Sequence, residues 1–467
     1  MTTLNNIMQP TVEMPVMPAE IGRLVAMLDK GDSMAAIFKE MVANGMVECI
    51  EDKKWFGEYS GPMSQLFLSM SRPLLRCVLT KTLGPSLYCK DIFCKKNWDN
   101  VFDIDGPGAY AMFSFIRDRK GKWLCVKEIR ELVLLVRDYE AAVDTCIRRR
   151  TDDVYGSSQL TREERRVLAR AMEIDDAERT NKQRLTLDDL DRFKPRFESQ
   201  STGSGFIAQL IAMLERRCLP NVDPEVHQCQ SPLMVGNAGN MKKRTVDHFP
   251  NNSLSKTPKT WGLLLSCMSV MGLRYEVQAV PLFRAWVDAK QVNAAEVLGT
   301  VLAGSLVSVS GMNVKQPGTR YEEARVDTYG YLNSQKHVWV GKPWFGENLK
   351  ASILDSERNR KSQKEIDEAN AELDRLEADT RRLEEEEEVL KKEVQEAEEH
   401  LKRVLAELEE DIAKREAFMA ETERDARVAV EFLAACESAG MNVGYMSDSE
   451  SQSAEDGNKG ENEGEDD

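Results

Sequence analysis

The sequence predicts a mostly α-helical protein: a helical body of two subdomains with little β structure, then a long carboxy-terminal coiled coil and a disordered acidic tail. Three observations support this fold class. Apolar residues recur at helical spacing in many segments of residues 19–350. A heptad pattern runs through residues 355–435, and residues 447–467 contain no large apolar side chain.

The composition is that of a globular chain with an acidic end. Of 467 residues, 42% are hydrophobic, so the chain is long enough to bury a sizeable core. Residues 351–467 hold 16 basic and 37 acidic side chains, so they carry a net charge of −21 within a total of −16. Residues 1–350 are therefore slightly basic, at +5. Collagen, a disulfide-stapled miniprotein and a multi-span membrane protein are excluded by this composition.

The compartment is predicted from the cysteines and the first residues. Ten cysteines are scattered along the chain, and the first thirteen residues contain no Lys or Arg. We therefore expect neither a secretory signal nor a disulfide framework, and predict a cytoplasmic protein, with the nucleus as an alternative. The uncharged stretch 297–314 is diluted by glycine, which favours a buried helix over a membrane span.

In the first half of the body, we predict a flexible arm over residues 1–18 and a helical subdomain over residues 19–219. Gly31 is expected to end a helix, Ser33 to cap the next one, and Thr161 with Glu164 to form a capping box. Residues 148–205 form a charge-dense segment within this subdomain. The expected helices cover residues 21–30, 34–44, 64–83 (whole or broken before Pro73), 128–147, 162–172, 187–193 and 206–217.

The second half of the body is more apolar. Residues 220–258 are rich in Pro and Asn and predict a loop-rich connection to a second, mostly helical subdomain over residues 259–350. Pro281 suits the first position of a short helix, and Asn293 is expected to cap a helix that reaches residue 310. Residues 336–345 are the clearest strand-like piece.

The coiled coil over residues 355–435 is the strongest pattern. With Ile366 as position a, eleven of the thirteen a and d positions up to residue 408 are Ile, Leu, Val or Ala, and Thr380 and Glu387 are the exceptions. A shift of four residues, typical of a stutter, continues the pattern from Ile412. The predicted oligomerisation seam consists of Ile366, Leu373, Leu376, Leu383, Leu390, Val394, Leu401, Val404 and Leu408.

Such a seam requires a partner helix, which is a second copy of this chain or another helical protein. The alternative is an isolated charged helix. Several Glu–Lys and Glu–Arg pairs stand four residues apart in the favourable order, for example Glu387 and Lys391, and each contributes a few tenths of a kcal/mol. The sustained seam favours the coiled coil, in either orientation.

The acidic tail over residues 440–467 is predicted to be disordered. Ser447 and Ser453 each have an acidic residue three positions later, so phosphorylation there would add to the negative charge. A tail that only keeps the protein soluble is the alternative.

Catalytic and metal signals are weak. Cys218, His227, Cys229 and His248 lie in one loop-rich stretch, but their spacing matches no zinc motif. Cys89 and Cys94 have no second pair nearby. No Ser, Cys or Asp pattern surrounds any of the four histidines, so we predict no enzyme, no cofactor and no metal.

A basic zone over residues 117–244 is the main alternative signal. Its basic clusters lie near aromatic residues, as a surface that contacts nucleic-acid phosphates and bases would require. Acidic residues are interleaved with them, which a mixed-charge surface also explains. The candidate nucleic-acid-binding residues are Arg148, Arg149, Arg150, Arg162, Arg165, Arg166, Lys242, Lys243 and Arg244.

Two functions follow from these patterns. The first is a non-enzymatic structural or scaffold protein that self-associates through its coiled coil. The second is a nucleic-acid-coating protein that binds RNA or DNA phosphates through the basic zone. Neither requires a membrane.

Overall fold

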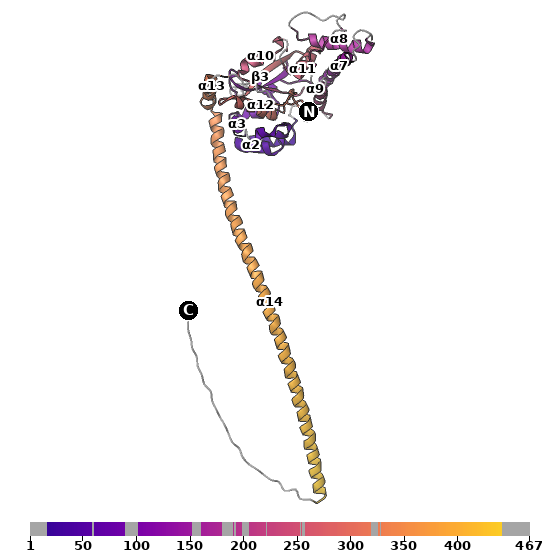
Figure 1. Ribbon diagram of the computed structural model, residues 1–467, viewed down its shortest axis with the longest axis vertical. Helices are drawn as coiled ribbons and strands as arrows, with labels where there is room; N and C mark the ends of the chain where they lie inside the picture. Colours follow the sequence, from indigo (N-terminus) through magenta and orange to yellow (C-terminus); the bar gives the residue numbers. More distant parts are fainter. Residues whose placement is uncertain are drawn as a thin grey trace, which may run out of the picture. The chain divides into compact units, whose positions relative to one another are not determined.

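The computed structural model describes residues 16–57, 60–88, 101–151, 160–179, 190, 193–198, 205–220, 222–252, 254, 257–318, 326 and 328–440. The chain divides into two units, Met1–Ser362 and Gln363–Asp467. The mostly α-helical prediction is confirmed, since helices dominate and one of them is very long (Figure 1). The predicted tail and most of the predicted arm lie outside the described residues.

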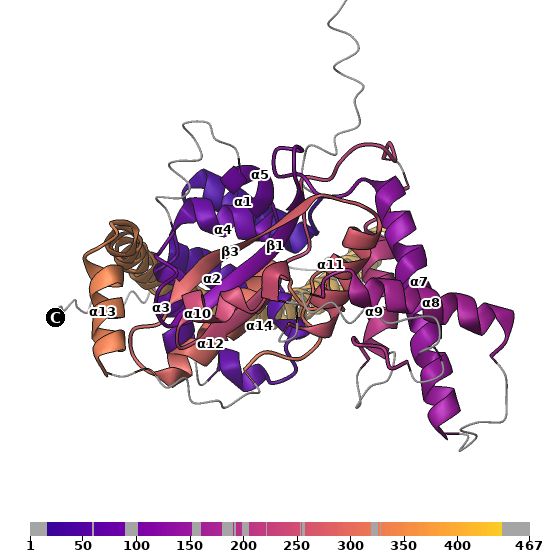
Figure 2. The same cartoon turned by 90° about the horizontal axis from the view of Figure 1, so that it is seen from above.

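In the first unit, helices surround a small sheet (Figure 2). Its strands are β1 (Gly108–Ile116), β2 (Met234–Ala238) and β3 (Tyr275–Arg284). Its α-helices are α1 (Ala19–Lys30), α2 (Met34–Ala43), α3 (Ser60–Leu68), α4 (Arg72–Leu79), α5 (Leu83–Tyr88), α7 (Val126–Thr151), α8 (Arg162–Asp176), α9 (Gly205–Arg216), α10 (Met241–Val246), α11 (Lys259–Val270), α12 (Ala289–Ala303) and α13 (Thr328–Trp339). Short 3-10 helices cover Met46–Cys49, Lys53–Phe56 and Pro250–Asn252.

The sheet has the order β2-β1-β3, and both neighbours of β1 are antiparallel to it. Ala111 pairs with Val235 of β2 and with Val280 of β3. All nine residues of β1 are buried, because helices cover both faces of the sheet. A strand covered on both faces has no polar–apolar alternation, which is why the sequence did not mark β1 as a strand.

The two faces of the sheet belong to two hydrophobic cores. Ala109, Phe113 and Phe115 of β1 point into a core formed with α1–α5, α12 and the start of the last helix. Tyr110 and Met112 point into the other core, formed with α7, α8, α9 and α11. Successive side chains on a strand face opposite ways, so β1 contributes to both cores at once.

The predicted division at residues 220–258 is therefore wrong. That segment supplies β2 and α10, and its strand pairs with β1 from the predicted first subdomain. The predicted second subdomain supplies β3, which pairs with the other edge of β1. Because the sheet joins all three segments, residues 19–350 lie in one compact unit.

Two helix predictions around β3 are also wrong. Pro281 lies within β3, opposite Tyr110 and next to a shift in the strand register. Proline is tolerated there because β3 is an edge strand. The cap of α12 is Asp288, whose side chain accepts from the Gln291 backbone N–H, and the helix ends at Gly304 rather than near residue 310.

The strand-like piece predicted over residues 336–345 is wrong as well. Residues up to Trp339 belong to α13, and α14 (Trp344–Ser438) begins after a short turn. Val338 is fully buried while Trp339 and Val340 are exposed, a pattern that suits one turn of a surface helix. Three consecutive apolar residues therefore misled the assignment, because only the first of them reaches the core.

Local capping signals are confirmed where the structure describes them. Gly31 ends α1 in a left-handed conformation with φ of 89°, and the Ser33 hydroxyl accepts from the Ala36 backbone N–H at 3.1 Å. Thr161 and Glu164 form the reciprocal capping box of α8. The predicted helix over residues 64–83 is two helices, with Pro73 in the first turn of α4.

The start of α14 is anchored in the first unit. The Trp344 indole N–H donates to the Ser69 carbonyl at 2.6 Å, and the Asn348 amide donates to the carbonyls of Leu68 and Met70 at 2.9 and 3.0 Å. These bonds satisfy carbonyl groups at the end of α3, which would otherwise lack a helical partner. In the second unit, α14 continues as an unbroken helix to Ser438.

Candidate functional site

The predicted seam lies on one continuous helix with its side chains in solvent. All nine seam residues are in α14, and their exposed fractions lie between 42% and 61%. Leu, Ile and Val are among the residues most often buried in folded proteins, so a continuous row of half-exposed ones is unusual. The structure therefore places the predicted seam on one helix and leaves it uncovered in the single chain. The seam residues are Ile366, Leu373, Leu376, Leu383, Leu390, Val394, Leu401, Val404 and Leu408.

The apolar surface continues past the predicted stutter and becomes wider. Ile412 and Met419 continue the row and are exposed. Phe418, Val430 and Phe432 are also exposed, although none of them stands on an a or d position of the pattern predicted from sequence. Counting every large apolar residue between residues 412 and 433, rather than heptad positions alone, would have found them.

Polar contacts along α14 are local. Lys391 Nζ lies 2.9 Å from Glu387 Oε1, and Lys414 Nζ lies 3.0 Å from Glu410 Oε1. Both are pairs four residues apart on an exposed helix, which contribute about 0.3–0.5 kcal/mol each. Glu387, the polar residue within the seam pattern, is thus already paired along its own helix.

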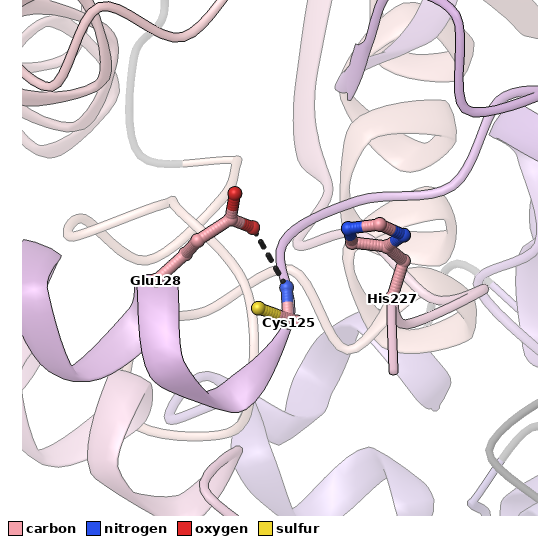
Figure 3. Close-up of side chains that lie close together, drawn as sticks. All are labelled: Cys125, Glu128 and His227. Atoms are coloured by element: carbon pink, nitrogen blue, oxygen red, sulfur yellow. Dashed lines mark hydrogen bonds between the residues drawn. The ribbon is translucent and has the colours of Figure 1, made fainter. Parts of the chain in front are cut away.

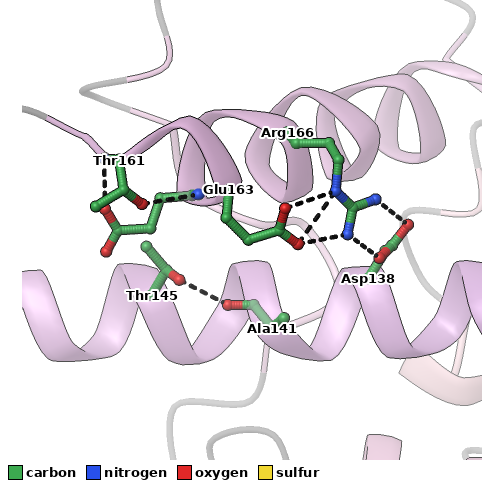
Figure 4. Close-up of polar contacts among 7 residues, drawn as sticks. Asp138, Ala141, Thr145, Thr161, Glu163 and Arg166 are labelled. Atoms are coloured by element: carbon green, nitrogen blue, oxygen red, sulfur yellow. Dashed lines mark hydrogen bonds and ion pairs between the residues drawn. The ribbon is translucent and has the colours of Figure 1, made fainter.

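Five of the nine basic candidate residues are paired with acidic side chains of the same chain. Arg166 is held between Asp138 of α7 and Glu163 of α8, at 2.9 and 2.7 Å, as Figure 4 shows. Further ion pairs join Arg148 to Glu164, Arg150 to Glu198, Lys242 to Asp105 and Arg244 to Asp247. Exposed pairs of this kind add little stability, but they cancel much of the positive charge of the zone.

The other four candidates are not brought together. Arg149 ends α7 and also has an interaction partner, Arg162 and Arg165 are exposed on α8, and Lys243 is exposed on α10. The zone is therefore spread over three helices.

The structure also forms a cluster that the sequence did not predict. One ligand atom from each of Cys125, Glu128 and His227 lies within 4.8 Å of the other two (Figure 3). Glu128 accepts from the Cys125 backbone N–H at 3.0 Å, and its two oxygens accept from the Arg119 guanidinium at 2.7 and 2.8 Å. Burial raises the pKa of the Cys125 thiol and lowers the pKa of His227.

This cluster is better explained as an ion pair than as a metal site. Burial opposes the charge of Glu128, but the hydrogen bonds from Arg119 and Cys125 hold the pKa of this carboxyl below its usual value. The positive charge of Arg119, bonded to both carboxylate oxygens, would oppose the binding of a metal cation there. The four possible zinc ligands considered from sequence, Cys218, His227, Cys229 and His248, share only His227 with this cluster. His248 is instead bonded to the Tyr110 hydroxyl at 2.8 Å. Cys89 and Cys94 lie outside the described residues.

Within the described part of the chain, no helix is long and apolar enough to cross a membrane. The uncharged stretch 297–314 forms the second half of the buried helix α12 and the turn after it. Comparison with protein-family models, curated proteins and solved structures gives no match to this chain.

Proposed function

We propose that this protein is a non-enzymatic structural protein that self-associates through the seam of α14. The observation that supports the proposal is the row of nine large apolar side chains that remain half-exposed along one helix. Full burial of one such side chain is worth about 1.5–3 kcal/mol. Covering the exposed halves of nine would release on the order of 10 kcal/mol per chain.

That free energy is large enough to drive association. Bringing two chains together costs about 4–15 kcal/mol in lost freedom of motion, and two seams would supply roughly twice the single-chain gain. The alternative, a helix that stays alone, rests on the ion pairs along α14. At a few tenths of a kcal/mol each, these pairs support the helix but do nothing to cover its apolar row.

The partner is a second copy of this chain in the simplest form of the proposal. A different helical protein with a matching seam would satisfy the same physical requirement. The acidic tail keeps such an assembly soluble, and phosphorylation of Ser447 or Ser453, both outside the described residues, would strengthen that effect.

Sedimentation equilibrium of the intact chain tests the proposal. We expect a mass that rises with concentration above the 52.9 kDa of one chain. Only the mass of one chain, up to about 100 µM, would contradict self-association, since seams of this length associate at micromolar concentrations or below. A mixed species found only with a second helical protein would move the proposal to that partner.

Coating of RNA or DNA by the basic zone is the second candidate, and it has less support. Five of its nine cations are paired with carboxylates of this chain, and nucleic acid would have to compete with those carboxylates. The exposed Arg162, Arg165 and Lys243 are what favours it.

A further inference from the structure

The side chains that flank the seam of α14 are strongly acidic. In a coiled coil, the e and g positions lie beside the row of a and d residues and face the partner helix. With Ile366 as position a, residues 370–407 contain twelve e and g positions, of which eight are Asp or Glu and one is Lys. All twelve are exposed. The eight acidic flank residues are Glu372, Glu377, Asp379, Glu384, Glu386, Glu393, Glu398 and Glu407.

Most of this negative charge is not neutralised along the helix itself. Three of the eight pair with arginines about one turn away, over N–O distances of 3.6–3.7 Å: Glu372, Asp379 and Glu386. Among the residues that the structure describes, the other five form no ion pair: Glu377, Glu384, Glu393, Glu398 and Glu407. The single basic flank residue, Lys391, is itself held by Glu387 at 2.9 Å. Five carboxylates therefore remain available to a partner.

A second copy of α14 covers the apolar row but brings like charges together. In a parallel pair, each g residue faces the e residue five positions later on the other helix. One of these contacts, Glu386 with Lys391, joins opposite charges. Three of them join two carboxylates: Glu372 with Glu377, Asp379 with Glu384, and Glu393 with Glu398. Glu387 also meets its own copy, because a positions face each other in a parallel pair.

An antiparallel pair of copies has the same difficulty. There, g positions face g positions and e positions face e positions. The six g positions hold five acidic residues and His400, and Lys391 is the only cation at the e positions. After the shift at Ile412, the e and g positions add no cation: Glu416, Phe418, Glu423, Asp425, Val430 and Phe432. Like charges that face each other weaken the pairing of two copies in either orientation.

A helix with flanks of the opposite charge avoids this repulsion. We propose that the seam of α14 binds an amphipathic helix of another protein that carries Lys or Arg at its e and g positions. Such a helix covers the apolar row as a second copy does, and its cations face the five available carboxylates. This inference rests on the proposed function, since it uses the same seam, and it makes self-association the weaker of the two pairings.

Two synthetic peptides test the charge of the partner on the intact chain. The acidic peptide has the sequence of residues 366–408, and the basic peptide differs from it only by Lys at the eight acidic flank positions. Fluorescence anisotropy of each labelled peptide gives its dissociation constant. At about 0.1 M salt we expect the basic peptide to bind at least about tenfold more tightly. This ratio should approach one at about 1 M salt, where the screening length falls from about 10 Å to about 3 Å.

Matched variants of the intact chain separate the flanks of the seam from the overall negative charge. One variant reverses two flank residues, Glu384→Lys with Glu393→Lys. The other reverses two residues at position f, on the far side of the helix, Glu385→Lys with Glu399→Lys. All four residues are exposed, so both variants are expected to keep the fold. We expect the flank variant to bind the basic peptide at least about threefold more weakly than the f variant does.

Equal affinity for the two peptides at about 0.1 M salt, or equal weakening in the two variants, would overturn the basic partner. If the chain then oligomerises in sedimentation equilibrium, the proposed function stands and the partner is a second copy. A chain that stays at the mass of one chain and binds neither peptide would overturn both proposals.

Discussion

Replacement of Leu390 by Lys is expected to weaken self-association strongly, because it removes one apolar layer from the seam of α14. Leu390 is 59% exposed in the single chain. That fraction of a full leucine burial amounts to roughly 1–2 kcal/mol for each chain, and therefore about 2–3.5 kcal/mol for a pair. Since each 1.4 kcal/mol corresponds to a factor of ten, the dissociation constant should rise about 30- to 300-fold.

The neighbouring Val389 provides a matched control. It is 57% exposed but stands at position c, away from the seam. Val389→Lys makes nearly the same change in charge and apolar area one residue away, so we expect its dissociation constant to remain within about threefold of the native value. Sedimentation equilibrium of the three intact chains measures the difference. Equal weakening by both substitutions would refute a defined seam and would indicate nonspecific association of an apolar helix.

Three further predictions concern the first unit and the basic zone. Burial lowers the pKa of His248 to about 4. As the pH falls from 7 to 5, the unfolded chain binds a proton at this histidine before the folded chain does, so the free energy of unfolding should fall by about 2 kcal/mol. Denaturant unfolding curves of His248→Gln should not show this loss. Ser71→Ala removes the hydroxyl that accepts from the Leu74 backbone N–H at the start of α4, and should lower the free energy of unfolding by about 0.5–2 kcal/mol, whereas Ser64→Ala within α3 should have a smaller effect. A plot of the logarithm of the RNA-binding constant against the logarithm of salt concentration should have a slope shallower than about −3 for the intact chain and single-stranded RNA. Nine free cations would give a slope of about −6, so a slope of −5 or steeper would instead support nucleic-acid coating.

Local features of the fold could be predicted because they depend on a few adjacent residues. Gly31 and Ser33 marked the end of one helix and the start of the next, and Thr161 with Glu164 marked the start of α8. Each of these signals satisfies backbone groups at a helix end, which makes it readable without the rest of the chain. The heptad pattern over residues 355–435 likewise predicted a long helix, and α14 contains all of these residues.

The sheet could not be predicted in the same way. Residues of β1 are apolar at nearly every position because two cores cover the strand, and an unbroken apolar run does not distinguish a strand from a buried helix. Pro281 was assigned to a helix start because that position tolerates a missing N–H, yet an edge strand tolerates it too. Residues 336–345 failed for the opposite reason, since a short apolar run on a helix resembled a strand.

Among the candidate sites, too, the one that depends on nearby residues could be predicted, and those that depend on distant residues could not. The seam residues were found from their spacing, because a helix places every third and fourth residue on one side whatever surrounds it. The basic zone was chosen from runs of like residues, but Asp138 and Glu198, which pair with Arg166 and Arg150, come from other segments. Lys81 and Arg217 are isolated in the sequence, and only the fold shows that the Lys81 ammonium group donates to the Ser310 hydroxyl and the Arg217 guanidinium to the Gln230 carbonyl.

The amino-acid sequence by itself determined the helical character of this protein, the caps of its helices and the apolar row along α14. These properties follow from interactions within about one turn of helix, which any reader of the chain can reconstruct. Only the tertiary structure decided that one sheet joins residues 19–350 into a single unit, and which cations meet a carboxylate and which do not. Those outcomes depend on contacts between residues far apart in the chain, since charge balance and burial are properties of neighbours in space.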